Sequence, residues 1–147
     1  MKTTLILAFL AAAFTCRSQT YQHKVVAAVI LGEAACQGRA GMIAVGEVIS
    51  RRAQLRGQSP LAVVTTRKAF SCLNRMTPEQ LVRKQSRQPG YAEALRIAQV
   101  AVDAPERLPG ITRGATHFTR SDERPTWARG VRPVLILGDH AFYRLRY

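Results

Sequence analysis

One stretch decides the fold: KVVAAVILGE, from Lys24 to Glu33. The residues from Val25 to Leu31 are apolar without a break, so a helix here has no face for solvent and must run through the core. Gly32 and Glu33 come at the end of that helix. A carboxylate at the mouth of an apolar core is desolvated, which favours its protonated form. Glu33 is therefore a candidate general acid, and the alternative is a solvated helix-end glutamate or one paired with Arg39.

The segment before this stretch has the order of a secretory signal. A short basic start, Met1-Lys2, leads into an almost unbroken apolar run, Thr3–Phe14, and then into small and polar residues up to Ser18. The run is too short to span a bilayer comfortably. We therefore predict a signal peptide over residues 1–18 and an exported domain over residues 19–147, in the periplasm, the cell envelope or the medium. The alternative is a buried N-terminal helix that belongs to the fold.

Cysteine usage agrees with export. Cys36 and Cys72 remain in the exported domain, and in an oxidising compartment two cysteines suit one disulfide, so we predict a Cys36–Cys72 bond. Two free thiols are the alternative. Cys16 offers a lipid anchor in place of simple cleavage, but Phe14-Thr15 before it make a poor lipobox. The chain has no CxxC and no Cys/His array, which counts against a structural zinc site.

Helix signals continue after Glu33, and strand signals end the chain. Capping residues mark two helix starts: Ser59 with Pro60, and Thr77 with Gln80 in a capping box. The predicted helices are 24–31, 42–55, a short one from residue 60, one from residue 78 and 91–102, with a turn over 38–41; the predicted strands are 116–119 and a hairpin of 134–137 and 140–145. This order indicates an α+β domain, rich in helix, with a small antiparallel sheet near the C-terminus.

The chain carries nine acidic residues against 22 lysines and arginines, so a carboxylate mechanism has few candidates. Apart from Glu33, each acid has an ordinary explanation. Glu47, for example, has Arg51 four residues later on a polar helix face, which predicts a solvated pair. The histidines offer a rival chemistry, in which His117 and His140 on neighbouring strands ligate a zinc ion, but no HExxH-type spacing supports it. We expect His23 to be exposed, and we expect no metal or other cofactor.

Three blocks of sequence follow one another in a family's order. They are ILGEA (30–34) with GMIAV (41–45), then FSC (70–72), then GATHF (114–118) with PTWA (125–128) and GDHAFY (138–143). Together they resemble the SleB-type cell wall hydrolases, the family that includes spore-cortex-lytic enzymes. The resemblance implies a peptidoglycan-cleaving domain with a lysozyme-like or lytic-transglycosylase-like fold, in which Glu33 is the general acid. Relatives often carry an arginine and a second glutamate just after the catalytic one, where this chain has Ala35-Cys36-Gln37.

The resemblance also implies a lining for the glycan cleft. The block 114–118 would line it, and the aromatic and histidine residues of the two later blocks would lie near it. The candidate substrate-binding residues are Thr116, His117, Phe118, Trp127, His140 and Tyr143. Trp127 suits a sugar face, with a core tryptophan as the alternative. Independently of the resemblance, we expect a disulfide from Cys36 to Cys72 to brace the loop beside Glu33.

The shortage of acids favours a lytic transglycosylase. Common glycosidases use two carboxylates, whereas here one glutamate would protonate the glycosidic oxygen and then, as a base, activate the sugar's C6 hydroxyl, which closes an anhydro ring. We expect cleavage between N-acetylmuramic acid and N-acetylglucosamine. Hydrolysis of the same bond, a zinc-dependent wall amidase and a non-catalytic basic wall-binding protein are the alternatives.

The net charge of +13 indicates an anionic partner. Export narrows the candidate partners to the envelope, and the resemblance narrows them to peptidoglycan and its anionic neighbours. It counts against nucleic acid, for which the sequence also lacks a recognition motif. We expect a monomer that is peripheral to the membrane at most.

Overall fold

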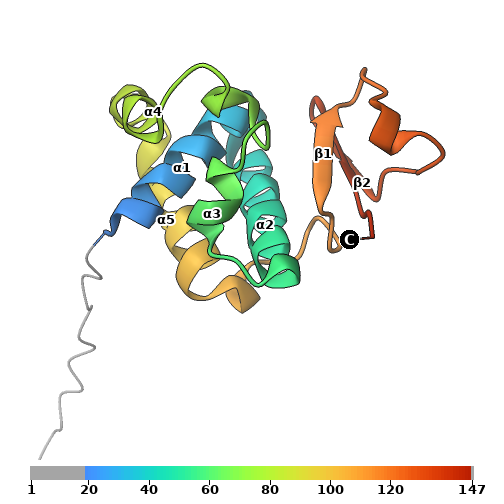
Figure 1. The fold of residues 1–147 in the computed structure, drawn as a ribbon, viewed down its shortest axis with the longest axis horizontal. Coiled ribbons are helices and arrows are strands. Elements are labelled where there is room, and N and C mark those ends of the chain that lie inside the picture. The colour runs from blue at the N-terminus through green and yellow to red at the C-terminus, as the bar shows by residue number, and fades with distance from the viewer. Residues whose placement is uncertain (1–18, 147) are drawn as a thin grey trace, which may run out of the picture.

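The chain folds into a helical body with a small sheet beside it (Figure 1). This computed structural model describes residues 19–146, so the predicted signal peptide over residues 1–18, with Cys16, lies outside the described residues. The helices are α1 (Tyr21–Ala34), α2 (Gly38–Arg56), α3 (Pro60–Thr65), α4 (Pro78–Gln85) and α5 (Tyr91–Asp103), and the strands are β1 (His117–Arg120), β2 (Leu135–Leu137) and β3 (His140–Tyr143). Four 3-10 turns are η1 (Ala35–Gln37), η2 (Ser71–Leu73), η3 (Pro105–Arg107) and η4 (Thr126–Ala128). The predicted helix-rich α+β class, with its small antiparallel sheet near the C-terminus, is confirmed.

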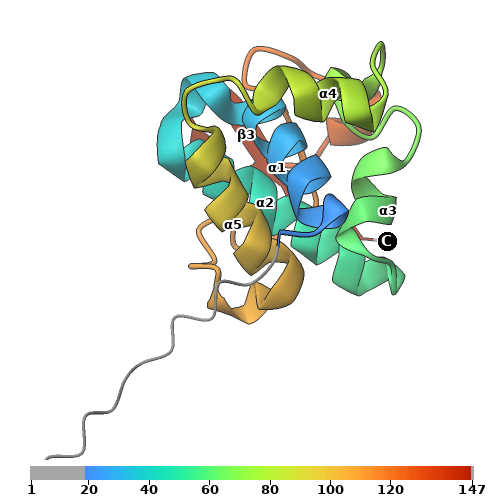
Figure 2. The same ribbon diagram turned by 90° about the vertical axis from the view of Figure 1, so that its left-hand side faces the viewer.

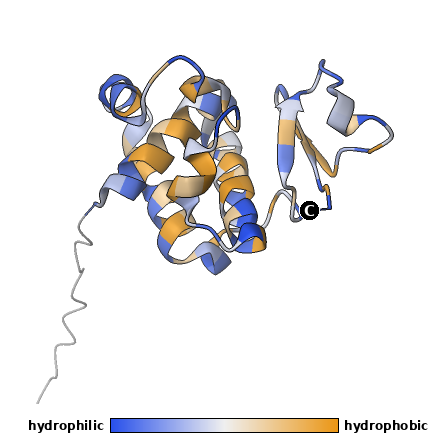
Figure 3. Cartoon of the chain, in the orientation of Figure 1, coloured by the Kyte–Doolittle hydropathy of each residue, from blue (hydrophilic) through white to orange (hydrophobic). Residues whose placement is uncertain are grey.

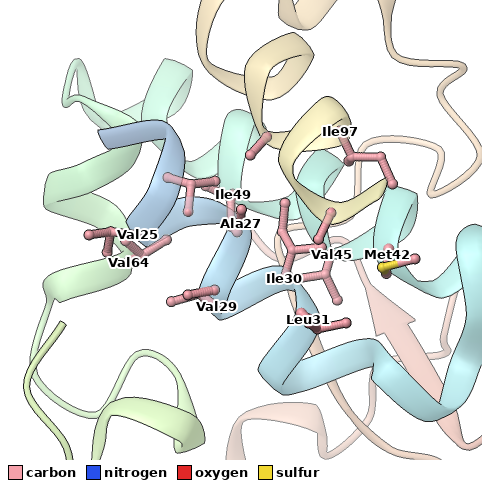
Figure 4. Packing of buried hydrophobic residues seen from close by; sticks show 14 of the residues in the cluster. Val25, Ala27, Val29, Ile30, Leu31, Met42, Val45, Ile49, Val64 and Ile97 are labelled. Atoms are coloured by element: carbon pink, nitrogen blue, oxygen red, sulfur yellow. The ribbon is translucent and has the colours of Figure 1, made fainter. Parts of the chain in front are cut away.

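α1 is the central helix of the body, as its unbroken apolar stretch predicts (Figure 2). Each residue from Val25 to Leu31 is at most 2% exposed. α1 contacts α2, α3, α4 and α5, and apolar side chains of α2, α3 and α5 pack around it (Figure 4). Apolar residues accordingly run along α1 in Figure 3. Because burying one valine, leucine or isoleucine side chain contributes about 1.5–3 kcal/mol, this helix anchors the fold.

The start of α1 corrects one expectation. His23 was expected to be exposed, yet it is only 3% exposed. Thr20 and His23 form a capping box, in which the Thr20 N–H donates to His23 Nδ1 at 3.0 Å. The other ring nitrogen, Nε2, lies 3.2 Å from Oδ1 of Asp103 at the end of α5. The ring therefore lies inward, with Nδ1 in the N-cap of α1 and Nε2 close to the end of α5.

The junction between α1 and α2 is shorter than predicted. The predicted turn over 38–41 is helical, and the break falls instead in η1, after which Gly38 adopts a left-handed φ of 63°. α2 then passes close to this turn, because a Cβ at Gly41 would collide with the Gln37 side chain. The turn is tight, so it brings the start of α2 directly beside the last turn of α1, where Glu33 lies.

Glu47 on α2 corrects a second expectation. It was predicted to form a solvated pair with Arg51, but it is only 7% exposed. Its carboxylate accepts hydrogen bonds from the backbone N–H groups of Gly110, Ile111 and Thr112 and from the Thr112 hydroxyl, at 2.7 to 3.0 Å. The loop 110–112 has backbone donors that need acceptors, and Glu47 satisfies them. Glu47 thus fixes the loop that leads from α5 to the sheet.

The sheet has the order β1-β3-β2, and both pairs are antiparallel. Phe118 pairs with Phe142 and His117 pairs with Tyr143. Because successive side chains of a strand point to opposite faces, Phe118, Phe142 and His140 share one face, while His117 and Tyr143 share the other. Phe142 is fully buried in a cluster with Ala44 and Val48 of α2, so the first of these faces is the one turned toward the helices.

A side chain from η1 also ties the sheet to the helical body. The predicted Gly-Asp turn joins β2 to β3, and Gly138 there has a left-handed φ of 55°. The Asp139 N–H donates to Gln37 Oε1 at 2.9 Å, and Gln37 Nε2 donates to Asp139 Oδ2 at 3.3 Å. A Cβ at Gly138 would collide with the same glutamine side chain. This contact brings the β2–β3 turn beside the end of α1.

Candidate active site

A cavity of about 390 Å³ lies between the end of α1 and the sheet. We call it the Glu33 cavity. The helical body contributes one part of its lining and the strands β1 and β3, with the turn after β1, contribute the other. The lining residues are Gly32, Glu33, Arg52, Ala69, Phe70, Ser71, Phe118, Thr119, Arg120, Glu123 and His140. The position of the cavity follows from the two contacts just described, which dock the sheet against α2 and η1.

Glu33 lies half-buried in the last turn of α1. Its Oε1 accepts a hydrogen bond from the Cys72 N–H at 3.0 Å and lies 3.0 Å from the Ser71 hydroxyl, which is 3.3 Å from Oε2. The alternative pairing with Arg39 does not form, because Arg39 pairs with Glu93 on α5 at 2.7 Å. The carboxylate is therefore held by η2 through Oε1, and Oε2 is the oxygen better placed to meet a substrate.

The approach of η2 to α1 depends on Gly32. A Cβ at Gly32 would lie 3.0 Å from the Cys72 Cβ and 3.3 Å from its sulfur, closer than side chains normally pack. Burial raises the pKa of the Cys72 thiol, and the charge of the Glu33 carboxylate raises it further. Cys72 thus stays protonated at neutral pH and does not act as a nucleophile.

The structure contains no disulfide between Cys36 and Cys72, and both are free thiols. The predicted bond is therefore not formed. Cys36 lies exposed on η1, whereas the Cys72 side chain is half-buried against Gly32 at the end of α1. The loop beside Glu33 is held instead by the hydrogen bonds from Ser71 and Cys72 to the carboxylate.

Arg52 of α2 is a cavity residue that the sequence did not reveal. It is 7% exposed, its Nε donates to the Thr116 carbonyl, and its guanidinium lies 5.3 Å from the centre of the Phe70 ring. It therefore joins the helical body to the residue before β1 and to the loop before η2. Its charge also balances part of the negative charge in the Glu33 cavity.

Two of the predicted substrate-binding residues, Phe118 and His140, line the Glu33 cavity. Their rings lie 5.3 Å apart on the helix-facing side of the sheet. Burial lowers the pKa of His140, and this outweighs the raising effect of Glu33 and Asp139, so the ring is neutral near pH 7. Its Nδ1 is buried and has no hydrogen-bond partner within residues 19–146. The ring thus contributes to the cavity wall while this nitrogen is enclosed by protein atoms.

The other four predicted residues do not line the Glu33 cavity. His117 and Tyr143 point to the opposite face of the sheet, where Trp127 packs 5.2 Å from the His117 ring and 5.4 Å from the Tyr143 ring. Thr116 is 1% exposed. Its hydroxyl donates to the Leu145 carbonyl and accepts a hydrogen bond from the Leu145 N–H. On this outer face Tyr143 is buried with Ala128 and Ala141, whereas Trp127 is 37% exposed, so its ring remains open to solvent away from the Glu33 cavity.

The separation of these residues onto two faces of the sheet also affects metal binding. His117 and His140 lie on opposite faces of the sheet, so they cannot ligate one ion together. Within residues 19–146 no three histidine, cysteine, aspartate or glutamate side chains gather closely enough to hold a metal. The zinc-dependent alternative therefore lacks the ligand pair on which it rested.

Glu123 is a second carboxylate in the Glu33 cavity. It lies in the turn after β1, where it accepts a hydrogen bond from the Thr119 hydroxyl at 2.7 Å. The neighbouring Arg120 donates two hydrogen bonds, each of 3.0 Å, to the two carboxylate oxygens of Asp122. From the sequence, Glu123 has an ordinary loop explanation, because no residue near it in the chain shows that the turn after β1 faces the end of α1.

Comparisons with known proteins give a family match and a structural match. Residues 36–143 match the model of a family described as Cell Wall Hydrolase. The match begins three residues after Glu33 and so does not include it. The fold is similar to the crystal structure of the catalytic domain of the Bacillus cereus SleB protein, with a TM-score of 0.62 and 18% sequence identity, covering 87% of this chain and 94% of that one. No curated protein sequence matches the chain.

Proposed function

Because the chain belongs to the cell wall hydrolase family, as its sequence blocks predicted, we propose that it cleaves peptidoglycan glycan strands with Glu33 as general acid. The bond cleaved joins N-acetylmuramic acid to N-acetylglucosamine. One observation carries the proposal: the last turn of the buried helix places the Glu33 carboxylate in a cavity wall, where two donors of η2 hold one of its oxygens. The family indicates an envelope or extracellular location, and export through residues 1–18 as a monomer is part of the proposal.

The geometry suits proton delivery from Oε2. In the protonated acid, Oε1 keeps its bond from the Cys72 N–H, and the proton on Oε2 faces the cavity. It passes to the glycosidic oxygen as the bond from that oxygen to C1 of the muramic acid breaks. A positioned acid of this kind contributes typically 10²–10⁴-fold to a rate. The leaving sugar then carries the new hydroxyl.

The second half of the reaction uses the same carboxylate. The acetamido group of the muramic acid stabilises the positive charge at C1, as in other substrate-assisted glycosidases. The Glu33 carboxylate takes the proton from the C6 hydroxyl, and the C6 oxygen closes onto C1 to give the anhydro ring. His140 lines the same cavity, where its neutral ring would contact the bound sugar.

Hydrolysis is the second candidate, and Glu123 is the observation that favours it. A carboxylate in the same cavity as the acid is what an inverting glycosidase uses to activate water. The two candidates share the role of Glu33 and differ only in the nucleophile that reaches C1.

The test is release of soluble sugar fragments from purified peptidoglycan. Glu33→Gln should release none, because glutamine keeps the shape and loses the transferable proton. The matched control is Glu106→Gln, an exposed glutamate outside the Glu33 cavity, which should act like the wild type. Thermal unfolding of both variants checks that the fold is kept. Undiminished fragment release by Glu33→Gln would refute the proposal.

A further inference from the structure

A second cavity, of about 540 Å³, flanks the loop that holds Glu33. It is lined by the residues on either side of the segment 69–72: Thr65, Thr66, Arg67, Lys68, Leu73, Asn74 and Arg75. We call it the basic cavity. Ala69, Phe70 and Ser71 between these two groups line the Glu33 cavity, and no residue lines both. The segment 65–75 therefore lines both the Glu33 cavity and the basic cavity, and the two cavities differ in their charged residues.

The charge of the basic cavity is unbalanced. Its lining holds three cations, Arg67, Lys68 and Arg75, and no carboxylate. None of the three forms an ion pair within the described part of the chain, whereas Arg39, Arg96 and Arg120 each pair with an acid. In the Glu33 cavity, by contrast, two glutamates face two arginines. Three unpaired like charges around one hollow repel one another, so an anion bound there gains from all three.

The uncharged groups of the lining are consistent with a polar anion. The Thr65 and Thr66 hydroxyls donate to the carbonyls of Leu61 and Ala62, so they are engaged with the backbone of α3. Asn74 adds an exposed amide. Leu73 is the one apolar residue of the lining, and it is half-buried against the main core. The charged and hydrogen-bonding groups of the basic cavity thus outnumber its one apolar side chain.

We propose that the basic cavity binds the phosphate groups of an anionic polymer of the cell envelope. Two N–H groups of an arginine guanidinium can bind two phosphate oxygens at once, and a lysine ammonium group adds a positive charge. Peptide stems of the wall carry ammonium groups as well as carboxylates, and the lining has no acid to receive them. A phospholipid surface is disfavoured because the one apolar side chain of the lining, Leu73, packs against the core and no large apolar side chain is available to enter a bilayer. Binding here would hold the enzyme on the wall beside the Glu33 cavity, with no part in bond cleavage.

The test measures binding of poly(glycerol phosphate), a probe without peptidoglycan, so its outcome does not depend on the proposed catalysis. Arg67→Gln/Lys68→Gln/Arg75→Gln should bind this polymer roughly tenfold or more weakly than the wild type. The matched control, Arg129→Gln/Arg132→Gln/Arg146→Gln, removes the same three charges from exposed positions around the sheet and should lose about twofold at most. Unfolding midpoints near that of the wild type establish that both variants fold.

Two further probes separate the sources of negative charge. Polyglutamate offers carboxylates and phosphatidylglycerol vesicles offer lipid phosphate, and both should bind the wild type more weakly than poly(glycerol phosphate). An equal loss in the two triple variants would show that only overall charge matters and would overturn the proposal. Equal or tighter binding of polyglutamate or of the vesicles would overturn it as well.

Discussion

The Ser71 hydroxyl oxygen lies 3.0 Å from one carboxylate oxygen of Glu33 and 3.3 Å from the other. The two residues come from segments that are 38 positions apart, and the contact joins η2 to the last turn of α1. Ser71 is therefore a positioning residue for the proposed acid. The neighbouring Cys72 N–H shares this task through a backbone bond that substitutions other than proline retain.

Removing the Ser71 hydroxyl should lower activity without unfolding the protein. Ser71→Ala loses a hydrogen bond that orients the Glu33 carboxylate, so we expect kcat to fall roughly tenfold or more. Because the residue is exposed, the unfolding midpoint should hardly change. The measurement is kcat on solubilised glycan strands, with Ser86→Ala, an exposed serine on the C-cap of α4, as control. Unchanged kcat in Ser71→Ala would show that the contact is incidental.

Glu47 should matter for stability and not directly for chemistry. In Glu47→Gln the new amide points hydrogens at backbone N–H groups of the loop 110–112, which leaves buried donors unsatisfied. We expect a loss of about 2–4 kcal/mol in the free energy of unfolding, measured with urea. Glu106→Gln, at an exposed glutamate, should change it by about 0.5 kcal/mol at most. An equally small change at Glu47 would mean that the loop is held by other contacts.

His117 should make the fold sensitive to mild acid. Burial, with the charges of Arg52 and Arg56, lowers its pKa from 6.5 to about 4. Between these two values the unfolded chain binds a proton that the folded chain does not, so the free energy of unfolding should fall as the pH is lowered from about 6.5 to 4. After allowance for solvent around a half-exposed ring, this amounts to the order of 1 kcal/mol. Unfolding midpoints across this range should decline less in His117→Gln, and an identical decline would argue against this assignment.

Glu123 distinguishes the two candidate reactions. If the C6 hydroxyl is the nucleophile, Glu123→Gln should keep its anhydro products and at least a third of wild-type kcat, because the carboxylate then has no step to perform. If water is the nucleophile, the same variant should lose activity by 10²-fold or more. Chromatography of the fragments with kcat measurement separates these outcomes. We expect Glu123→Gln to keep its anhydro products.

The sequence predicted the helical body well because its signals are local. The apolar run of α1 and the caps at Ser59 and Thr77 depend on neighbours within a few residues, and α3 and α4 begin at Pro60 and Pro78 as predicted. Glu47 and His23 were predicted wrongly because their partners, the loop 110–112 and Asp103, are distant in the chain. Polar residues with remote partners look solvated when only their own helix is considered.

The candidate site was predicted in part for a related reason. The end of a buried helix identifies Glu33 from one segment alone, whereas the lining of the cavity depends on which face of the sheet meets α2. Strand alternation separates Phe118 from His117 but does not say which of them faces the cavity. Arg52, Ser71 and Glu123 come to the cavity only through the tertiary packing of three segments, and no local pattern marks them.

The central claim is that Glu33 cleaves the glycan bond with closure of an anhydro ring. Its most direct test is mass spectrometry of peptidoglycan digested in water enriched in heavy oxygen, with the wild type beside Glu33→Gln. We expect the wild-type fragments to end in a muramic acid that is one water lighter than the reducing sugar and carries no heavy oxygen. Glu33→Gln should release no fragments. Reducing ends that carry heavy oxygen, or the same fragments from Glu33→Gln, would contradict it.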